Sequence, residues 1–248
     1  MTPIDMSRAL VFGRTAETYS RSRPTYPAEA VAWLVPGAAG RVADVGAGTG
    51  QLTGSLLERG LAVDAVEPDP AMLDVLRRLH PGATAHCAPS HRLPVVDHSL
   101  DAVLVADAWH WFPFDETVAE VRRVLRPGGS LGLVWNKVTP RRRWELELAG
   151  IDPDLKGTGD DRPVDLPFPA DEAQIASFPH VWRVTPQQYR DCLSTNSAVI
   201  LMTDEERSHR LDSAEALLAD VCRREGTATV DLQQEAFCIR WTPGSPGS

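Results

Sequence analysis

The chain has 248 residues, of which 43% are apolar and 24% charged, as in an ordinary globular protein. This length allows one large domain or two small ones. The 25 basic and 34 acidic residues give a net charge of −9, which argues against a protein that holds nucleic acid mainly through phosphate. No apolar run approaches the ~20 residues that a membrane helix needs, and the first ten residues lack the pattern of a signal peptide.

Four cysteines are scattered along the chain without the spacing of a zinc site: Cys87, Cys192, Cys222 and Cys238. Such isolated thiols are typical of core residues in a reducing compartment, so we expect a cytoplasmic protein. A group of acids follows residue 150, namely Asp152, Asp154, Asp160, Asp161 and Asp165. We expect these acids to face solvent, because a magnesium site needs ligands in strict octahedral geometry. No metal is therefore predicted.

The first part of the chain alternates helices and short apolar strands. A helix capped by Ser7 is predicted to about Tyr19 and to end before Pro24, and a second helix runs from Pro27 to Pro36-Gly37. The pattern then predicts, in order, a strand over 41–45, a glycine-rich turn over 46–50, a helix over 51–59, a strand over 61–66, a helix from Asp69-Pro70 to 79 and a weak strand over 83–87.

The same alternation continues to residue 136. A strand is predicted over 100–106, a helix over 115–125, a turn over 126–129 and a strand over 130–135. These strands lack polar alternation, which indicates a parallel sheet covered on both faces and a doubly wound α/β fold. Residues 137–172 show little periodicity, and a strand over 178–185, a helix over 205–224 and a strand over 235–241 follow.

The glycine-rich turn, Gly46-Ala-Gly48-Thr-Gly50, ends the first strand, where doubly wound sheets bind their ligands. Glycine lets a ligand approach the backbone closely. The next strand ends at Glu67, and 67 − 46 = 21, close to the ~20-residue offset of an acid that binds ribose hydroxyls. We therefore expect an adenosine-containing ligand, although a plain strand-turn-helix junction remains the alternative.

Two residues favour one such ligand over another. A dinucleotide site needs its third glycine one position later, where this chain has Gln51. Asp44 precedes the turn, and its carboxylate would repel a pyrophosphate but attract an ammonium or a sulfonium. S-adenosylmethionine carries both of these cations, whereas NAD carries neither.

At this point the chain resembles the class I S-adenosylmethionine-dependent methyltransferases over about residues 12–136. The motifs that carry the resemblance are Asp44-Val-Gly-Ala-Gly-Thr-Gly50, Val66-Glu-Pro-Asp69, Asp101-Ala-Val-Leu-Val-Ala106, His110-Trp-Phe112 and Arg123-Val-Leu-Arg-Pro-Gly-Gly129. The leader and Val134-Trp-Asn136 are similar to a narrower subgroup that includes trans-aconitate-type enzymes. The resemblance implies a Rossmann-like, seven-stranded sheet, mostly parallel with an antiparallel last strand.

The resemblance also assigns cofactor contacts to residues of this chain. Glycines 46, 48 and 50 would line the methionine part, with Asp44 near its amino group and Glu67 on the ribose. Further cofactor contacts implied are Pro68, Met72, Ser90 and Ala106, together with Tyr19 and Arg23 of a leader that folds over the cofactor. The chain departs from the family after the third strand, where Pro89 and His91 replace the usual acidic contact.

Two candidate catalytic residues lie on either side of the strand predicted over 100–106. His110 and His91 are the candidate bases, because histidine titrates near neutral pH. Each has a structural alternative, a packing corner for His110 and a solvated loop for His91. The expected acceptor-side residues are Tyr26, Trp109 and Trp111, and the basic run 141–143 is a weaker candidate for an anionic acceptor.

Taken together, the sequence predicts a methyltransferase that moves a methyl group from S-adenosylmethionine to oxygen or nitrogen of a small molecule, such as a secondary metabolite. A protein that binds the cofactor without methyl transfer (a regulatory module or a cyclase) is the alternative, and an NAD-dependent oxidoreductase is a weaker one. The expected division is a helical leader or lid over 1–36, a cofactor-binding core over 37–136, a continuation with substrate-side insertions over 137–242 and a frayed tail over 243–248.

Overall fold

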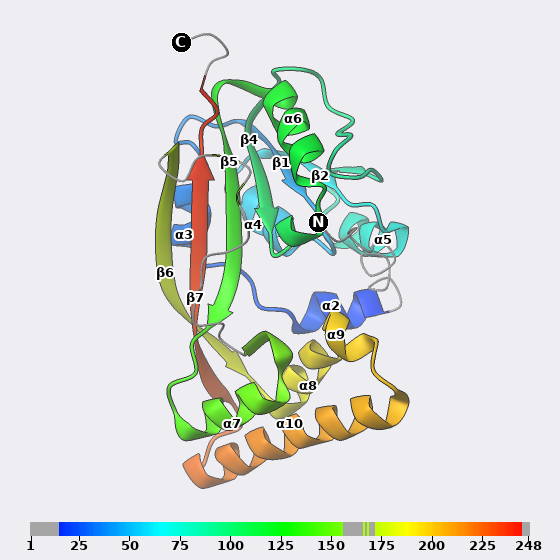
Figure 1. The fold of residues 1–248 in the computed structure, drawn as a ribbon, viewed down its shortest axis with the longest axis vertical. Coiled ribbons are helices and arrows are strands. Elements are labelled where there is room, and N and C mark those ends of the chain that lie inside the picture. Colours follow the sequence, from blue (N-terminus) through cyan, green and yellow to red (C-terminus); the bar gives the residue numbers. More distant parts are fainter. Residues whose placement is uncertain (1–14, 156–165, 167, 169–171, 245–248) are drawn as a thin grey trace.

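A seven-stranded sheet forms the centre of the molecule in the computed structural model, which describes residues 15–155, 166, 168 and 172–244 (Figure 1). The strand order is β3-β2-β1-β4-β5-β7-β6. The strands are β1 (Arg41–Val45), β2 (Ala62–Val66), β3 (Thr84–His86), β4 (Leu100–Ala106), β5 (Leu125–Val138), β6 (Ala173–Val184) and β7 (Val230–Trp241). Neighbours among β1 to β5 are parallel, and β7 runs antiparallel to both β5 and β6. The Rossmann-like sheet predicted from the sequence is thus confirmed.

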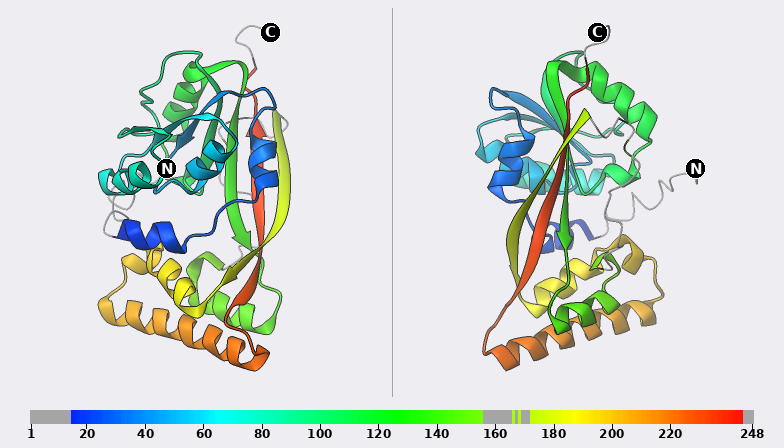
Figure 2. Two further views of the ribbon diagram at one scale, coloured as in Figure 1. Left: turned by 180° about the vertical axis from the view of Figure 1, so that it is seen from behind. Right: turned by 60° about the vertical axis from the view of Figure 1, so that its left-hand side comes forward.

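Helices cover both faces of the sheet, as the apolar strands require (Figure 2). Helices α3 (Ala28–Leu34) and α4 (Gln51–Glu58) pack their apolar side chains on one face, against residues of β1, β2, β4 and β5. Helix α6 (Phe114–Val124) packs on the other face. Helix α5 (Pro70–Leu79) begins at Asp69, whose carboxylate accepts from the backbone N–H of Ala71 at 2.8 Å, so the predicted N-cap is confirmed.

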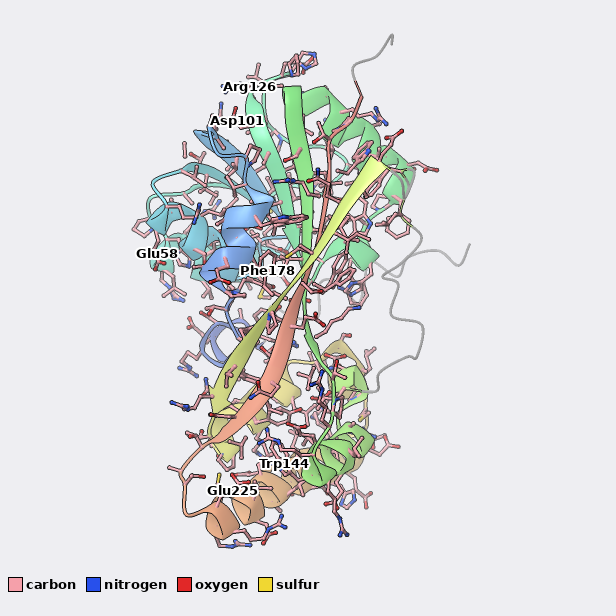
Figure 3. All side chains as sticks on the ribbon, turned by 90° about the vertical axis from the view of Figure 1, so that its left-hand side faces the viewer. Glu58, Asp101, Arg126, Trp144, Phe178 and Glu225 are labelled. Atoms are coloured by element: carbon pink, nitrogen blue, oxygen red, sulfur yellow. The ribbon has the colours of Figure 1, made fainter. Side chains whose placement is uncertain are left out.

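Strands β5, β6 and β7 are much longer than β1 to β3. They extend past the ends of the shorter strands and lead into a second group of helices (Figure 1). We call this group the helical cap; it comprises α7 (Arg143–Ile151), the short η3 turn (Pro153–Leu155), α8 (Pro186–Ser194), α9 (Ser197–Ile200) and α10 (Asp204–Glu225). The cap has an apolar cluster of its own, which includes Trp144, Leu148, Leu193, Leu218 and Leu232. Figure 3 shows Trp144 in the cap and the ion pair of Asp101 and Arg126 at the opposite end of the sheet.

The leader helix α2 (Ala16–Ser22) lies between the sheet and the cap, where it contacts α5 and α8 (Figure 1). It ends at Ser22, three residues beyond the predicted end at Tyr19, and the predicted N-cap Ser7 lies outside the described residues. Among the described residues, none of the helices is long and apolar enough to cross a membrane.

The structure departs from the sequence-based elements mainly after residue 136. Helix α7 was not predicted; it starts where the buried Glu145 accepts from the backbone N–H of Arg141 at 2.8 Å and of Arg142 at 2.9 Å. Strand β6 begins at Ala173 rather than at 178, because much of this edge strand is exposed and shows no apolar run. The predicted turn over 126–129 lies within the bounds of β5 as a bulge, since Leu100 pairs with Leu125 but Ala102 with Ser130.

Gly132 of β5 provides a test of the packing between the sheet and α3. A Cβ atom there would lie 2.7 Å from Leu104 Cδ2 and 3.1 Å from Leu34 Cδ2, and both leucines are fully buried. Gly132→Ala should therefore lower the free energy of unfolding by about 1–3 kcal/mol, measured by urea denaturation. Gly150→Ala, in the exposed last turn of α7 with nothing near the new atom, is the matched control. Equal stability of the two variants would contradict this packing.

Candidate active site

A cavity of about 420 Å³ lies between the carboxyl edge of the sheet and the helical cap. Its walls come from the glycine turn, from the residues that follow β2, β4 and β5, and from the leader and the cap. This is the edge at which the sequence predicted the ligand site. Of the predicted site residues, the cavity brings together Tyr19, Arg23, Tyr26, Asp44, Gly46, Gly48, Glu67, Pro68, Met72, Ala106, His110 and Trp111.

The three glycines of the turn all have positive φ, but they have different neighbours. A Cβ on Gly46 would lie 2.7 Å from Ala108 Cβ, and a Cβ on Gly50 would lie 2.4 Å from the ring of His80. Gly48 is open, with Met72 Cε at 3.8 Å as the nearest atom to such a Cβ. Gly50 does not line the cavity, so its role is to begin α4 and to make room for His80.

Glu67 is 7% exposed, and each of its carboxylate oxygens accepts a backbone hydrogen bond. Oε2 accepts from the N–H of Gly48 and Oε1 from the N–H of Asp69, both at 2.9 Å. Burial raises the pKa of Glu67 to about 7, although these two bonds oppose the shift. A carboxylate oxygen has more than one lone-pair site, so this group retains capacity for ligand hydroxyls.

Asp44 is 1% exposed, and only one of its oxygens has a partner among the described residues. Oδ2 accepts from Thr53 Oγ1 at 2.6 Å, while Oδ1 is buried and accepts no hydrogen bond. Burial raises the pKa of Asp44 to about 6. A buried acceptor without a donor is costly, which indicates that a ligand supplies one.

The leader contributes Arg23 and Tyr26 to the cavity. Arg23 Nε donates to Thr195 Oγ1 of the cap at 3.1 Å, and its guanidinium lies 4.9 Å from the ring centre of Tyr19. Gln51, at the position where a dinucleotide site has its third glycine, donates from Nε2 to the carbonyl of Ser20 at 3.2 Å. The leader is thereby fixed to both the glycine turn and the cap.

Asp107, which follows β4, was missed by the sequence reasoning. Its backbone has φ of 51°, a conformation that is uncommon for a residue other than glycine. Its carboxylate accepts from Tyr26 Oη at 2.7 Å, and burial raises its pKa to about 6. The sequence could have indicated Asp107 as a site residue, because an acid directly after a buried parallel strand lies at the edge of the sheet where ligands bind.

The η2 turn (Trp109–Trp111) places its three residues differently. His110 and Trp111 line the cavity, with ring centres 4.8 Å apart, and desolvation lowers the pKa of His110. Trp109, expected on the acceptor side, is fully buried in the core, where it stacks on Phe114 at 5.7 Å. The 3₁₀ turn directs this apolar ring inward and away from the cavity.

Three further candidates lie outside the cavity, and for His91 and the basic run this fits the solvated alternative. Ser90 is buried beside α6, with Oγ 3.0 Å from Thr117 Oγ1, and the exposed His91 also lies outside the cavity wall. In the basic run, Arg142 pairs with Glu145 and Arg143 pairs with Glu147. These arginines stabilise the start of α7 rather than meet the cavity.

The cap supplies residues that sequence reasoning placed in solvent or did not single out. Asp152 is 7% exposed and accepts from Tyr189 Oη and from the backbone N–H of Asp154. Both acids line the cavity; the expectation that they face solvent was wrong for the buried Asp152, whereas Asp154 is exposed. Asp160, Asp161 and Asp165 lie outside the described residues. Among the described residues, no group of three metal-ligating side chains is present.

Comparisons with known proteins agree with this arrangement. Residues 43–133 match the model of a methyltransferase domain. A protein of Mycobacterium tuberculosis, described as an uncharacterized methyltransferase, is 44% identical over 241 residues, which cover 96% of this chain and 97% of the relative. The chain belongs to the methyltransferase family. A methyltransferase-like structure from Anaeromyxobacter dehalogenans, 28% identical, superposes with a TM-score of 0.66 over 88% of this chain and 96% of its own.

The methyltransferase fold implies S-adenosylmethionine as the cofactor, and the cavity of this methyltransferase fits it. The open backbone at Gly48 allows close approach, and the unpartnered Oδ1 of Asp44 matches an ammonium group. Glu67, Pro68 and Met72 line the part of the cavity expected to hold ribose and adenine. The acidic edge of the turn suits a cationic ligand better than a pyrophosphate.

The raised pKa of Glu67 predicts a pH dependence of stability in the ligand-free protein. Between about pH 4.5 and about pH 7 the folded state binds the proton more than the unfolded state, so raising the pH removes stability. His80 and His110, whose pKa values are lowered, act in the opposite sense over part of this range. The comparison must therefore be made against Glu67→Gln, which lacks the titrating group.

From about pH 5 to about pH 7.5, the melting temperature of the parent should fall relative to that of Glu67→Gln. A difference of about 1 kcal/mol corresponds to about 2–4 °C in a protein of this size. Scanning calorimetry across the range measures it. Parallel profiles for the two proteins would show that Glu67 is not perturbed.

Proposed function

We propose that this methyltransferase binds S-adenosylmethionine in the cavity and transfers its methyl group to a small molecule held on the cap side. The observation that carries the proposal is the pair of buried carboxylates at the glycine turn. Glu67 is held by two backbone N–H groups in reach of a ribose, and Asp44 keeps one buried oxygen without a donor. S-adenosylmethionine offers ribose hydroxyls to Glu67 and an ammonium group to Asp44, whereas NAD offers no ammonium group to Asp44.

Bound at this edge, S-adenosylmethionine supplies a methyl group already activated on sulfur, so the protein has mainly to align the acceptor and exclude water. Arg23 would bind the carboxylate of the cofactor, since its guanidinium lies in the cavity beside Tyr19. The leader and the cap close the site as a lid, because the hydrogen bond from Arg23 to Thr195 joins them directly.

The acceptor would enter from the side of β4 and β5, where Tyr26, His110 and Trp111 line the cavity. His110 has a lowered pKa, so it is neutral near pH 7 and able to accept a proton from an acceptor oxygen or nitrogen. Partly buried aromatic walls favour an acceptor with an apolar or aromatic body, as in many secondary metabolites. We propose transfer to oxygen or nitrogen of such a molecule.

Gly48 tests the location of the cofactor. Gly48→Val should abolish S-adenosylmethionine binding in calorimetry, because a branched side chain would fill the open space against the turn and strain a backbone with φ of 56°. Gly37→Val, which has nothing near its Cβ, should bind normally. Unchanged affinity in a folded Gly48→Val protein would mean that the cofactor lies elsewhere.

Glu67 tests the ribose contact. Glu67→Ala should weaken S-adenosylmethionine and S-adenosylhomocysteine alike by about ten- to a hundredfold, because hydrogen bonds to a charged group contribute about 1.5–3 kcal/mol. NAD, titrated in parallel, should not bind to the parent. An effect of less than about twofold on the folded variant would exclude the ribose role, and tight binding of NAD would contradict the proposed function.

A further inference from the structure

The cap-side part of the cavity differs chemically from the cofactor part. We call it the acceptor half and define it by Asp107, Trp111, Trp135, Asp152, Asp154 and Gln234. It combines residues from β4, β5, β7 and the start of the cap, elements that are far apart in the sequence. Three carboxylates therefore line this part of the cavity, in addition to Asp44 and Glu67 on the cofactor side.

These three carboxylates influence one another. The charge of Asp154 raises the pKa of both Asp107 and Asp152, although burial is the larger cause for each. Arg23 offsets part of this charge, because its guanidinium lowers the pKa of both Asp107 and Asp152, and Lys137 Nζ lies 4.5 Å from the ring centre of Phe237. The three carboxylates still outnumber these two cations, so the acceptor half is an acidic environment that a cationic guest would stabilise.

Two amide oxygens point independently to a ligand that donates hydrogen bonds. Gln234 is 7% exposed, and its Oε1 is buried without a partner among the described residues. Asn136 donates from Nδ2 to the carbonyl of Thr25 at 3.2 Å, which orients its own unpartnered Oδ1. Val138 pairs with Gln234 across β5 and β7, so both amides lie on one face of the sheet. Buried acceptors of this kind are normally satisfied.

Aromatic rings complete the walls. Trp111, Trp135 and Trp182 are partly buried and line the cavity together with Tyr189. Trp182 and Tyr189 lie with ring centres 5.7 Å apart. Aromatic faces attract ammonium groups, and they also accommodate an apolar body attached to such a group.

We propose that the acceptor is an amine, bound as an ammonium ion in the acceptor half and methylated on nitrogen. This inference rests on the proposed function and specifies its substrate class. Asp154, Asp107 and the two amide oxygens bind the ammonium, and the tryptophans enclose the rest of the molecule. A carboxylate acceptor would be repelled, and an alcohol would leave the excess of acidic charge uncompensated.

The chemistry balances without a further reagent. The ammonium first gives one proton to His110, the candidate base of the proposed function, or to water, which leaves a neutral amine. Its nitrogen lone pair then forms the new N–C bond while the C–S bond breaks and its electrons remain on sulfur. The product is a methylated ammonium, so the positive charge of the sulfonium passes to nitrogen and stays matched by the same carboxylates.

The test is a binding comparison with three probes of similar size, phenethylamine, phenethyl alcohol and phenylacetate. Calorimetry is performed with and without S-adenosylhomocysteine. The amine should bind at least about tenfold more tightly than the alcohol, since charge-assisted hydrogen bonds contribute about 1.5–3 kcal/mol, and phenylacetate should bind least. Failure to bind the amine, or equal binding of the alcohol, would overturn the proposal.

Asp154 offers the matched variant, because its side chain is exposed at the cavity and carries no core packing. Asp154→Asn should reduce the preference for the amine, and Asp154→Lys should shift it toward phenylacetate. Glu147→Gln, on the surface of α7 and outside the cavity, should keep the preference of the parent. An unchanged preference in both Asp154 variants would count against the assignment. If the parent protein does not bind S-adenosylhomocysteine, the proposed function is contradicted. If the parent binds S-adenosylhomocysteine but does not prefer the amine, only this inference is contradicted.

Discussion

The site depends on one constraint, namely that two carboxylates are buried beside a backbone turn that has to stay open. Glu67 is stabilised by the N–H groups of Gly48 and Asp69, and Gly48 can present its N–H only because the turn adopts positive φ. Asp44 has one oxygen satisfied by Thr53 and one left for a ligand. Burial raises the pKa of both acids, so the empty site is unfavourable and a cationic cofactor relieves it.

The first half of the fold was predictable from sequence because local and global signals agree there. The strand over 100–106 is β4, and Asp69 caps α5 as its sequence position indicates. Buried parallel strands are continuous apolar runs, and helices are bounded by caps, prolines and glycines. The residues that line the cavity beside the glycine turn could be predicted for the same reason, since the ends of parallel strands meet at one edge.

The second half was less predictable because its order comes from long-range packing. Strand β6 is an edge strand whose sequence has no apolar run, and α7 begins with a basic run that suggested a solvated surface. Asp152 is buried only because the cap places Tyr189 against it. Gln234 likewise faces the cavity through the register of β5 and β7, which no local pattern specifies. Of the acceptor half, the sequence indicated Trp111, whereas its carboxylates and Gln234 were recognised only in the folded structure.

Two parts of this methyltransferase build the cavity, namely the sheet with its glycine turn and the leader with the helical cap. In the proposed function, the sheet and its glycine turn provide the cofactor half, while the leader and the helical cap provide the other walls of the cavity. The hydrogen bonds from Gln51 to Ser20 and from Arg23 to Thr195 join the two parts. Specificity can thus change in the cap without disturbing the turn that binds the cofactor.

The most direct test of this account is a crystal structure of the protein with S-adenosylhomocysteine. It should show the ribose hydroxyls on the carboxylate of Glu67 and the amino group within hydrogen-bond distance of Asp44 Oδ1. The backbone of Gly48 should lie against the ligand, and the acceptor half should remain free for a second molecule. A ligand bound outside this cavity, or one that leaves Asp44 Oδ1 without a donor, would contradict the account.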